Sequence, residues 1–387
     1  MNTAYDVIII GAGPAGLNAA LHLLQSTPRP SVLLADKGIP WDRPIACAEG
    51  VWYGPFNSAI EVKPEWIRFF ISKAVLHSPS GTSITYFDKN KGCIINRALM
   101  QRDLARQCEV RGASVRLNCR ALDISVDRGE YREVYFSDGS LRRGKVVIDA
   151  SGPISGFGKK EKIDWKPLDL EAAYFAVAEW SSVENDAVHV YLGREVAPGG
   201  YAWAFPRESG TINAGIVVGK HSLGKVNIRS LLDAFLKRNF PNAKVIRYFA
   251  GAIPCECRKA AISASRLLKA GDAASATNPI SRAGIFEALV SGGLAGDFAV
   301  RMLAADSPKR MIAICRDYCA SWHAALGKAH CKLSRVKDSL LKVPDGDYDG
   351  AFATLKNIPQ NKLAMSKIIG LSLGRFPRLV WAVRHLM

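Results

Sequence analysis

A glycine-rich turn between a short strand and a helix dominates the first forty residues. Residues 6–10 form a β-branched run, residues 11–16 read Gly-Ala-Gly-Pro-Ala-Gly, and residues 17–24 have a helix-like pattern. A second apolar run, 31–35, ends in Asp36. Such a turn lets the backbone approach a pyrophosphate at the helix N-terminus, and an acidic residue about 20 positions on binds the adenosine ribose. The pattern predicts a βαβ unit that binds a dinucleotide, rather than a glycine turn in an ordinary α/β domain.

Length and composition indicate a folded protein of two domains. The chain has 387 residues, of which 48% are apolar and 22% charged. We find no signal peptide and no apolar run near the roughly 18 residues of a membrane span, so we expect a cytoplasmic protein. Nine scattered cysteines, an odd number, indicate reduced thiols rather than a disulfide framework.

The net charge of +17 is large for a chain of this length. A basic surface attracts anionic lipid, acidic substrates or nucleic acid, or simply keeps a protein soluble. The sequence carries no RNA- or DNA-binding signature and no basic stripe interleaved with aromatic residues. We therefore expect no nucleic-acid partner.

The pattern changes along the chain and predicts an α/β fold. Residues 145–149 form another buried strand that ends in Asp149, whereas residues 168–248 alternate as short antiparallel strands. We expect a Rossmann-like dinucleotide-binding domain, an antiparallel-sheet substrate domain and a helical C-terminal region. The predicted boundaries are 1–74, 97–157 and 262–308 for the first, 75–96 and 158–261 for the second, and 309–387 for the third. Within them we expect a hairpin at 75–87 and helices at 96–108, 231–239, 285–303 and 312–326.

Three separate segments resemble the motifs of one group of flavoproteins. They are the unit at 6–36, the sequence Asp-Ala-Ser-Gly at 149–152, and Gly271-Asp272 leading to Pro279 and Gly284. Together they are similar to FAD-dependent oxidoreductases of the para-hydroxybenzoate hydroxylase-like group. The resemblance implies non-covalent FAD, with Arg97 near its phosphates, in a Rossmann-like FAD-binding domain. The implied cofactor-binding residues are Gly11, Gly13, Ala15, Gly16, Asp36, Lys37, Cys47, Ala48, Arg97, Gly271, Asp272, Pro279, Gly284 and Ile285.

Two further segments resemble the geranylgeranyl reductase family in particular. Residues 44–50 read Pro-Ile-Ala-Cys-Ala-Glu-Gly, and residues 201–206 read Tyr-Ala-Trp-Ala-Phe-Pro. Members of this family reduce isolated C=C bonds of prenyl chains by hydride transfer from reduced flavin. The resemblance implies a hydrophobic prenyl or lipid substrate, with NADPH or ferredoxin as the reductant. The alternative is a flavin-dependent monooxygenase or halogenase acting on a hydrophobic or aromatic substrate, because halogenases carry a related tryptophan motif.

The same resemblance places the loop of Cys47 and Glu49 beside the flavin. An unactivated alkene needs a proton donor as well as a hydride, so we expect Cys47 to flank the reacting bond, with Glu49 less directly involved. A packing role for Cys47 and a loop salt bridge for Glu49 remain open. Tyr201 and Trp203 share one strand face with Phe205, and we expect them to wall an apolar tunnel; the alternative is ordinary sheet core.

One residue departs from the family pattern. Relatives have glycine where this chain has Arg282, and that glycine lets backbone approach the flavin ring. We expect either a shifted loop or an Arg282 side chain that faces the N1/O2 edge of the flavin. A solvated loop arginine is the alternative.

A face of cysteine and histidine lies on the predicted helix 312–326. Cys315, Cys319 and His323 are spaced four residues apart and, with His330 or Cys331, would supply metal ligands. Cysteine is among the most buried residue types, so a core stripe is favoured. Cys255 and Cys257 are spaced too closely for a usual structural zinc site. We expect no metal.

The C-terminal segment is basic and apolar. No acidic residue follows Asp349, and the composition is typical of an interfacial helix on anionic lipid, interrupted by Pro377. We expect peripheral contact with the cytoplasmic face of a membrane; the alternative is a helix packed on the FAD-binding domain. The basic residues are Lys356, Lys362, Lys367, Arg375, Arg378 and Arg384.

Overall fold

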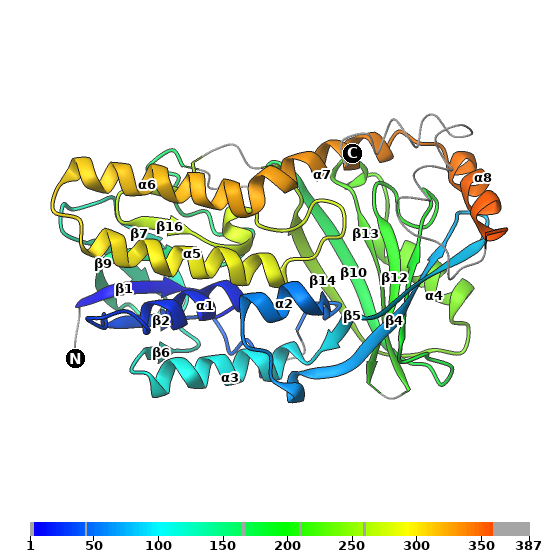
Figure 1. The fold of residues 1–387 in the computed structure, drawn as a ribbon, viewed down its shortest axis with the longest axis horizontal. Coiled ribbons are helices and arrows are strands. Elements are labelled where there is room, and N and C mark those ends of the chain that lie inside the picture. Colours follow the sequence, from blue (N-terminus) through cyan, green and yellow to red (C-terminus); the bar gives the residue numbers. More distant parts are fainter. Residues whose placement is uncertain (1–3, 43–44, 164–166, 209, 258–260, 359–387) are drawn as a thin grey trace. The chain divides into compact units, whose positions relative to one another are not determined.

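The computed structural model describes residues 4–42, 45–163, 167–208, 210–257 and 261–358, with only the backbone at 88–90. The chain divides into two compact units, each made of three segments. The first, which we call the nucleotide unit, comprises 1–45, 97–168 and 254–331. The second, the sheet unit, comprises 46–96, 169–253 and 332–387. Figure 1 shows the elements of each unit.

These boundaries differ from the predicted ones in several places: residues 158–168 and 254–261 also fall in the nucleotide unit, residues 332–358 fall in the sheet unit, and two further segments differ as follows. Residues 46–74 fall in the sheet unit, because β3 (Gly50–Trp52) and β4 (Ile67–His77) both pair with β5 (Ser83–Ile95). Residues 309–331 fall in the nucleotide unit, because α6 (Pro308–Trp322) packs against α5 (Ile285–Leu303). Both differences arise from long-range pairing and packing, which local sequence patterns do not encode.

A parallel sheet forms the centre of the nucleotide unit, and the predicted βαβ unit is its core. Strands run in the order β16-β9-β1-β2-β6, each parallel to its neighbour. Helix α1 (Pro14–Leu23) connects β1 to β2. The strands are β1 (Ala4–Ile10), β2 (Val32–Ala35), β6 (Ser114–Arg116), β9 (Leu141–Asp149) and β16 (Leu267–Lys269).

The two faces of this sheet are covered differently. On one face α1 lies between α3 (Arg97–Val110) and α5. The approach of α5 is close, since a Cβ on Gly292 would lie 2.1 Å from the Ala15 carbonyl oxygen. On the other face β7 (Ala121–Ile124) and β8 (Arg132–Phe136) cover the sheet with a second apolar core. The unit therefore has three layers.

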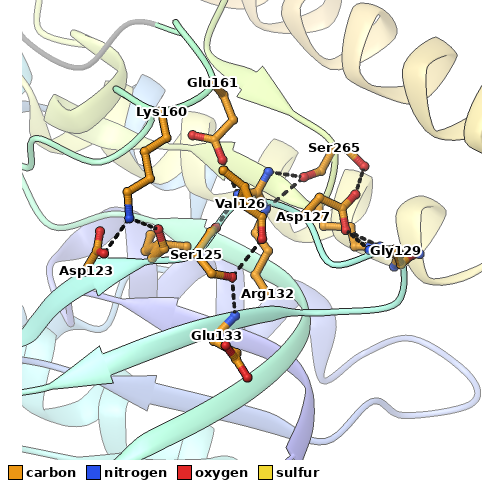
Figure 2. A network of polar contacts seen from close by, with 12 residues as sticks. Asp123, Ser125, Val126, Asp127, Gly129, Arg132, Glu133, Lys160, Glu161 and Ser265 are labelled. Atoms are coloured by element: carbon orange, nitrogen blue, oxygen red, sulfur yellow. Dashed lines mark hydrogen bonds and ion pairs between the residues drawn. The ribbon is translucent and has the colours of Figure 1, made fainter.

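A buried arginine of β8, Arg132, links the β7–β8 pair to the turn between β15 (Ser263–Ala264) and β16. The Arg132 guanidinium donates to the carbonyls of Ser125, at 2.8 Å, and Ser265, at 2.9 Å, and pairs with Glu161. Figure 2 shows Arg132 at the centre of this network, with Lys160 bonded to Asp123 beside it. The network fixes the start of β16, the strand that leads to Gly271.

The sheet unit contains one large, mostly antiparallel sheet in the order β14-β10-β13-β12-β11-β4-β5-β3. Only the β11–β4 pair among those with a described register is parallel. Helix α4 (Ile228–Asn239) packs on one face against a row of alanines. The remaining strands are β10 (Leu170–Glu179), β11 (Ala187–Tyr191), β12 (Tyr201–Glu208), β13 (Thr211–Val218) and β14 (Lys244–Pro254).

The other helices complete the two units. Helix α2 (Tyr53–Ala59) follows β3, and α8 (Asp345–Lys356) packs through Phe352 and Leu355 on Ile84 of β5. Helix α7 (Lys328–Leu340) follows a π-helical segment, His323–Gly327. Within the described part of the chain, no helix is long and apolar enough to cross a membrane.

The cysteines correct one expectation. Cys257 and Cys331 form a disulfide, so the prediction that all nine thiols are reduced is wrong for this pair. The fold brings together two residues 74 positions apart, which their spacing did not indicate. Cys331 is thus taken up by the disulfide and does not supply a metal ligand. Cys315 and Cys319 lie beside Ser263, whose hydroxyl donates to the Cys315 carbonyl at 2.9 Å. Among the residues that the structure describes, no three potential metal ligands gather at one point.

Candidate functional site

The glycine turn leaves open space at the N-terminus of α1. A Cβ on Gly13, the residue that precedes the helix, would meet nothing within 4 Å. A Cβ on Gly16 would instead lie 1.8 Å from the Gly11 carbonyl oxygen. Gly11 itself has φ +105°, in the region that favours glycine. Gly16 is therefore needed by the turn's own packing, whereas Gly13 keeps space free where free N–H groups attract an anion.

Asp36 lies at the tip of β2 and is bonded to the same turn. One carboxylate oxygen accepts from the Ala12 N–H at 2.8 Å, and the other accepts from the Gly38 N–H at 2.9 Å. Each oxygen keeps a further lone pair for a ribose hydroxyl. The neighbouring Lys37 side chain is exposed. The βαβ geometry thus holds an acceptor beside the phosphate position.

Arg97 begins α3 and is linked to the glycine turn through one amide. Its Nε donates to Gln101 Oε1 at 2.7 Å, and Gln101 Nε2 donates to the Ala12 carbonyl at 3.3 Å. Gln101 is buried. Sequence reasoning missed Gln101; its place one helical turn after Arg97 was the signal that would have found it.

Asp272, in the third sequence segment of the nucleotide unit, interacts with Arg97. Burial raises the pKa of its carboxyl, against the hydrogen bond from Thr277 at 2.9 Å and the charge of Arg97, which both lower it. Gly271 has φ +60°, and a Cβ there would lie 2.9 Å from the Ala15 Cβ. Three segments far apart in sequence therefore meet around the glycine turn.

In the loop after Asp272, Arg282 has the positive φ that is typical of glycine, the residue that relatives have at this position. Arg282 has φ +58°, its N–H donates to the Asn278 carbonyl at 3.0 Å, and its guanidinium donates to the Ile280 carbonyl at 2.5 Å. The side chain thus bonds to its own loop. Pro279 is buried in this loop, and Gly284 and the buried Ile285 lead into α5.

Glu287, in the first turn of α5, is a buried acid that sequence reasoning missed. Burial and the nearby Asp272 raise the pKa of its carboxyl to about 7, and one of its oxygens has no hydrogen-bond partner among the described residues. An acidic residue in the first turn of a helix that is rich in small and apolar residues was the available signal. Glu287 lies two residues after Ile285 and so belongs to the same region.

The residues of the nucleotide unit fit FAD. Gly13 leaves space that a larger side chain would fill, the α1 N-terminus suits a pyrophosphate, and Asp36 suits a ribose. Cys47 and Ala48, the predicted FAD contacts that belong to the sheet unit, stay predictions.

In the sheet unit, the loop of Cys47 is bonded to the central strands. Asn213 of β13 donates from Nδ2 to the Cys47 carbonyl at 2.9 Å and accepts from Trp203 Nε1 at 2.9 Å. The N–H of Glu49 donates to Cys47 Sγ at 3.3 Å. The Cys47 side chain is half-buried. The two segments that resemble the reductase family are therefore joined through Asn213.

Glu49 is buried and forms an ion pair with Arg207, with 3.1 Å between Oε2 and Nη1. Its backbone has φ +63°, unusual for a residue with a side chain, and its carbonyl accepts from the Ile95 N–H at 3.0 Å. The ion pair matches the salt-bridge interpretation of Glu49; a catalytic role stays a prediction. Arg207 was missed by sequence reasoning.

Tyr201 and Trp203 lie with Phe205 on the sheet face opposite α4. Ala48 and two further aromatic residues, Phe175 and Phe249, belong to the same cluster. Phe175 and Phe249 stack with ring centroids 4.8 Å apart. Trp203 is 6% exposed, whereas Tyr201 and Phe205 are half-buried. This face is an aromatic surface next to the Cys47 loop.

Comparison with known proteins now places the chain. Residues 169–253 match the geranylgeranyl reductase catalytic domain, and residues 6–166 match the lycopene cyclase protein family. The chain is 30% identical over 390 residues to the digeranylgeranylglycerophospholipid reductase of Methanocella arvoryzae, and the match covers 98% of both chains. The chain belongs to the geranylgeranyl reductase family. A further relative, digeranylgeranylglycerophospholipid reductase 2 of Methanococcoides burtonii, is 29% identical over 394 residues, or 99% of this chain and 96% of the relative.

A solved structure shares the fold of this geranylgeranyl reductase family member. It is a geranylgeranyl bacteriochlorophyll reductase-like protein from Thermoplasma acidophilum, with a TM-score of 0.88, 23% identity and complete coverage of both chains. The predicted fold class, α/β with an antiparallel sheet and a helical C-terminal region, is confirmed.

Proposed function

We propose that this chain is an FAD-dependent reductase that saturates C=C bonds of geranylgeranyl chains carried by a glycerophospholipid. The observation that carries the proposal is that Asn213 forms hydrogen bonds both to the Cys47 loop and to Trp203 in the Tyr201–Pro206 segment. The chain that contains this arrangement matches a curated reductase along almost its whole length. The relatives' names supply the substrate class. A monooxygenase or halogenase is not favoured, because these full-length relatives are named reductases.

The nucleotide unit would hold the cofactor. The N–H groups at the α1 N-terminus and the guanidinium of Arg97 suit the phosphates, Asp36 suits the ribose, and Asp272 with its loop suits the ribityl side. When bound and reduced, FAD supplies a hydride.

The sheet unit would supply the proton and the apolar surroundings. Addition of hydrogen across an alkene needs a proton at the carbon next to the one that receives hydride. The Cys47 thiol holds a proton at Sγ, and the Glu49 N–H that donates to this sulfur stabilises it after the proton has left. Water then returns a proton to the sulfur.

The aromatic face would hold the prenyl chain and exclude water. Tyr201, Trp203 and Phe205 offer ring surface that matches an unsaturated hydrocarbon, and the indole N–H is already satisfied by Asn213. No polar group of Trp203 is thus left facing an apolar substrate.

We further propose NADPH or reduced ferredoxin as the reductant and peripheral contact with an anionic membrane. Both reductants deliver electrons that the flavin accepts, and the substrate proposed here is a membrane lipid. The basic tail supports membrane contact; its residues 359–387 lie outside the part of the chain that the structure describes.

The test is stoichiometric and anaerobic. The FAD-loaded protein is photoreduced and mixed with a digeranylgeranyl glycerophospholipid, and the lipid is analysed by mass spectrometry. We expect reoxidation of the flavin together with lipid products that have gained two hydrogens for each double bond. A flavin that stays reduced, with unchanged lipid, would contradict the proposal. Separate anaerobic mixing of the oxidised protein with NADPH and with reduced ferredoxin identifies the reductant by the rate of flavin bleaching.

A further inference from the structure

We propose that Asn213 is a positioning residue for Cys47, which sets the direction of the Cys47 thiol and so the rate of proton delivery. The inference rests on the proposed function, since it concerns the same proton donor. Asn213 is the third residue of β13 and is 1% exposed. Its neighbours along the strand are apolar and its cross-strand partners are Val177 and Phe205.

A buried amide at this position is costly unless both its oxygen and its nitrogen find hydrogen-bond partners. Taking an amide out of water without partners destabilises a fold, and an apolar residue of similar volume would fill the core without that cost. Asn213 avoids the cost by making one bond as acceptor, to Trp203, and one as donor, to Cys47. Its polar group therefore serves the loop rather than the sheet, whose backbone ladders are complete without it.

Trp203 determines which way the amide faces. An indole nitrogen can only donate, so the Asn213 oxygen must be the atom beside Nε1 of Trp203. The amide nitrogen is thereby aimed at the Cys47 carbonyl, at 2.9 Å. The orientation of the amide follows from chemistry, and with it the position of the Cys47 backbone.

The Cys47 thiol is then fixed from both sides of its own residue. Asn213 holds the carbonyl, and the N–H of Glu49 donates to Sγ. The Glu49 residue is itself held in place, with φ +63° in its backbone and an ion pair between its side chain and Arg207. Loss of the Asn213 bond would release the carbonyl end of this arrangement, while the aromatic face stays in place.

The deciding variant is Asn213→Asp. It keeps the shape of the side chain and an acceptor for Trp203, but it sets a second oxygen against the Cys47 carbonyl. At pH 8 we expect normal FAD content, KM within about threefold and kcat lower by about 10- to 100-fold. As the pH falls, protonation of the introduced carboxyl creates an O–H that donates to the Cys47 carbonyl. The kcat deficit relative to the unmodified protein should therefore narrow at low pH.

Two comparisons separate positioning from general damage. Asn239→Asp adds the same charge at the end of α4, where the amide donates to the Phe235 carbonyl at 2.9 Å, and should leave kcat unchanged. In a Cys47→Ala background, Asn213→Asp should cause little further loss, because the thiol that it misplaces is absent. If Asn213→Asp fails to fold, Trp203→Phe, which removes the donor that orients the amide, should lower kcat more than it raises KM.

The outcomes are distinct. An FAD-loaded Asn213→Asp protein with unchanged kcat, or losses that multiply fully in the Cys47→Ala background, would overturn the inference. If Trp203→Phe is the variant used, unchanged kcat overturns it likewise. Failure of the proposed function looks different: the unmodified protein would then leave the prenyl lipid unreduced.

Discussion

Gly50 lies against the ring of Phe205, so closely that a Cβ at residue 50 would lie 3.1 Å from a ring carbon. Gly50 ends the first segment that resembles the reductase family, and Phe205 lies in the second. A side chain at residue 50 would require the Phe205 ring or the loop to shift by a few tenths of an ångström. The glycine is explained by a ring about 150 residues away in sequence, and the two motifs form one packed structure.

The glycine turn predicts opposite effects for two similar substitutions. Gly16→Ala should destabilise the protein even without FAD, because its Cβ would overlap the Gly11 carbonyl. Gly13→Val should leave the FAD-free protein stable, since its Cβ meets nothing, but should weaken FAD binding by at least about tenfold by occupying the phosphate position. Thermal unfolding without FAD and flavin titration separate the two. Equal FAD affinity in Gly13→Val would place the cofactor elsewhere.

Cys47→Ala should retain FAD and lose most alkene reduction. The thiol is proposed to act on substrate, and no FAD-holding contact in the nucleotide unit depends on it. Loss of a general acid lowers rates by about 10²- to 10⁴-fold. The measurement is single-turnover oxidation of photoreduced flavin by the prenyl lipid, with the flavin absorbance as a control for loading. Full activity would return Cys47 to a packing role.

The ion pair of Glu49 and Arg207 predicts rescue by a double substitution. Arg207→Leu removes the cation beside a buried carboxylate and should lower the unfolding free energy by about 3 kcal/mol. Adding Glu49→Gln should restore most of the stability. If Glu49 is only structural, the double variant also regains activity; if it acts on substrate, stability returns and activity does not. Unfolding curves and turnover together decide.

His330 predicts a loss of stability in acid. Burial lowers the pKa of its imidazole to about 4, whereas an exposed histidine titrates near 6.5. Between these values the unfolded chain binds a proton that the folded chain rejects. The contribution of neutral His330 to the unfolding free energy is therefore fully present above about pH 6.5 and is lost as the pH falls towards 4.

At pH 5 the loss due to His330 should be about 2 kcal/mol. The Tm of the unmodified protein should fall between pH 7 and pH 5, and His330→Gln should reduce that fall. His221→Gln, at an exposed position, is the matched control and should not change it. An identical Tm decrease in all three proteins would contradict the assignment.

The C-terminal tail predicts salt-sensitive membrane binding. Each Lys or Arg near an anionic surface contributes about 1 kcal/mol, so sedimentation with anionic liposomes should fall steeply with added salt, and neutral liposomes should bind weakly. A chain ending at residue 358 keeps α8 complete and is the matched comparison. Equal sedimentation of the two chains, or of neither, would make the tail structural.

Local patterns carried the prediction of the fold a long way. The alternation of strand, glycine turn and helix predicted β1, α1 and β2, and the small-residue pattern at 285–303 coincides with α5. The alternation at Tyr201 and Trp203 also predicted their common face. These features repeat within a few residues, so the sequence itself displays them.

What sequence reasoning missed depends on partners far along the chain. The hairpin predicted at 75–87 is the tip of a longer pair, Ile67–His77 with Ser83–Ile95, whose bulges break the simple alternation. Asn213 resembled an ordinary strand residue until the fold brought Cys47 to it. The contacts of Arg207 and Gln101 and the Cys257–Cys331 disulfide were missed for the same reason. Their partners are neighbours only in the folded chain, and the local sequence does not indicate which residues these partners are.

The order of strands in the nucleotide unit has a consequence for synthesis on the ribosome. Strand β1 leaves the ribosome first, yet its neighbour β9 ends at Asp149, and β16, the partner of β9, ends only at Lys269. Asp272 follows, so 272 of 387 residues must be made before the group around the glycine turn can assemble. The β4–β5 hairpin joins neighbouring segments and can pair much earlier. The proposed FAD site is therefore completed late in translation or after it, whereas the residues of the hairpin are made early.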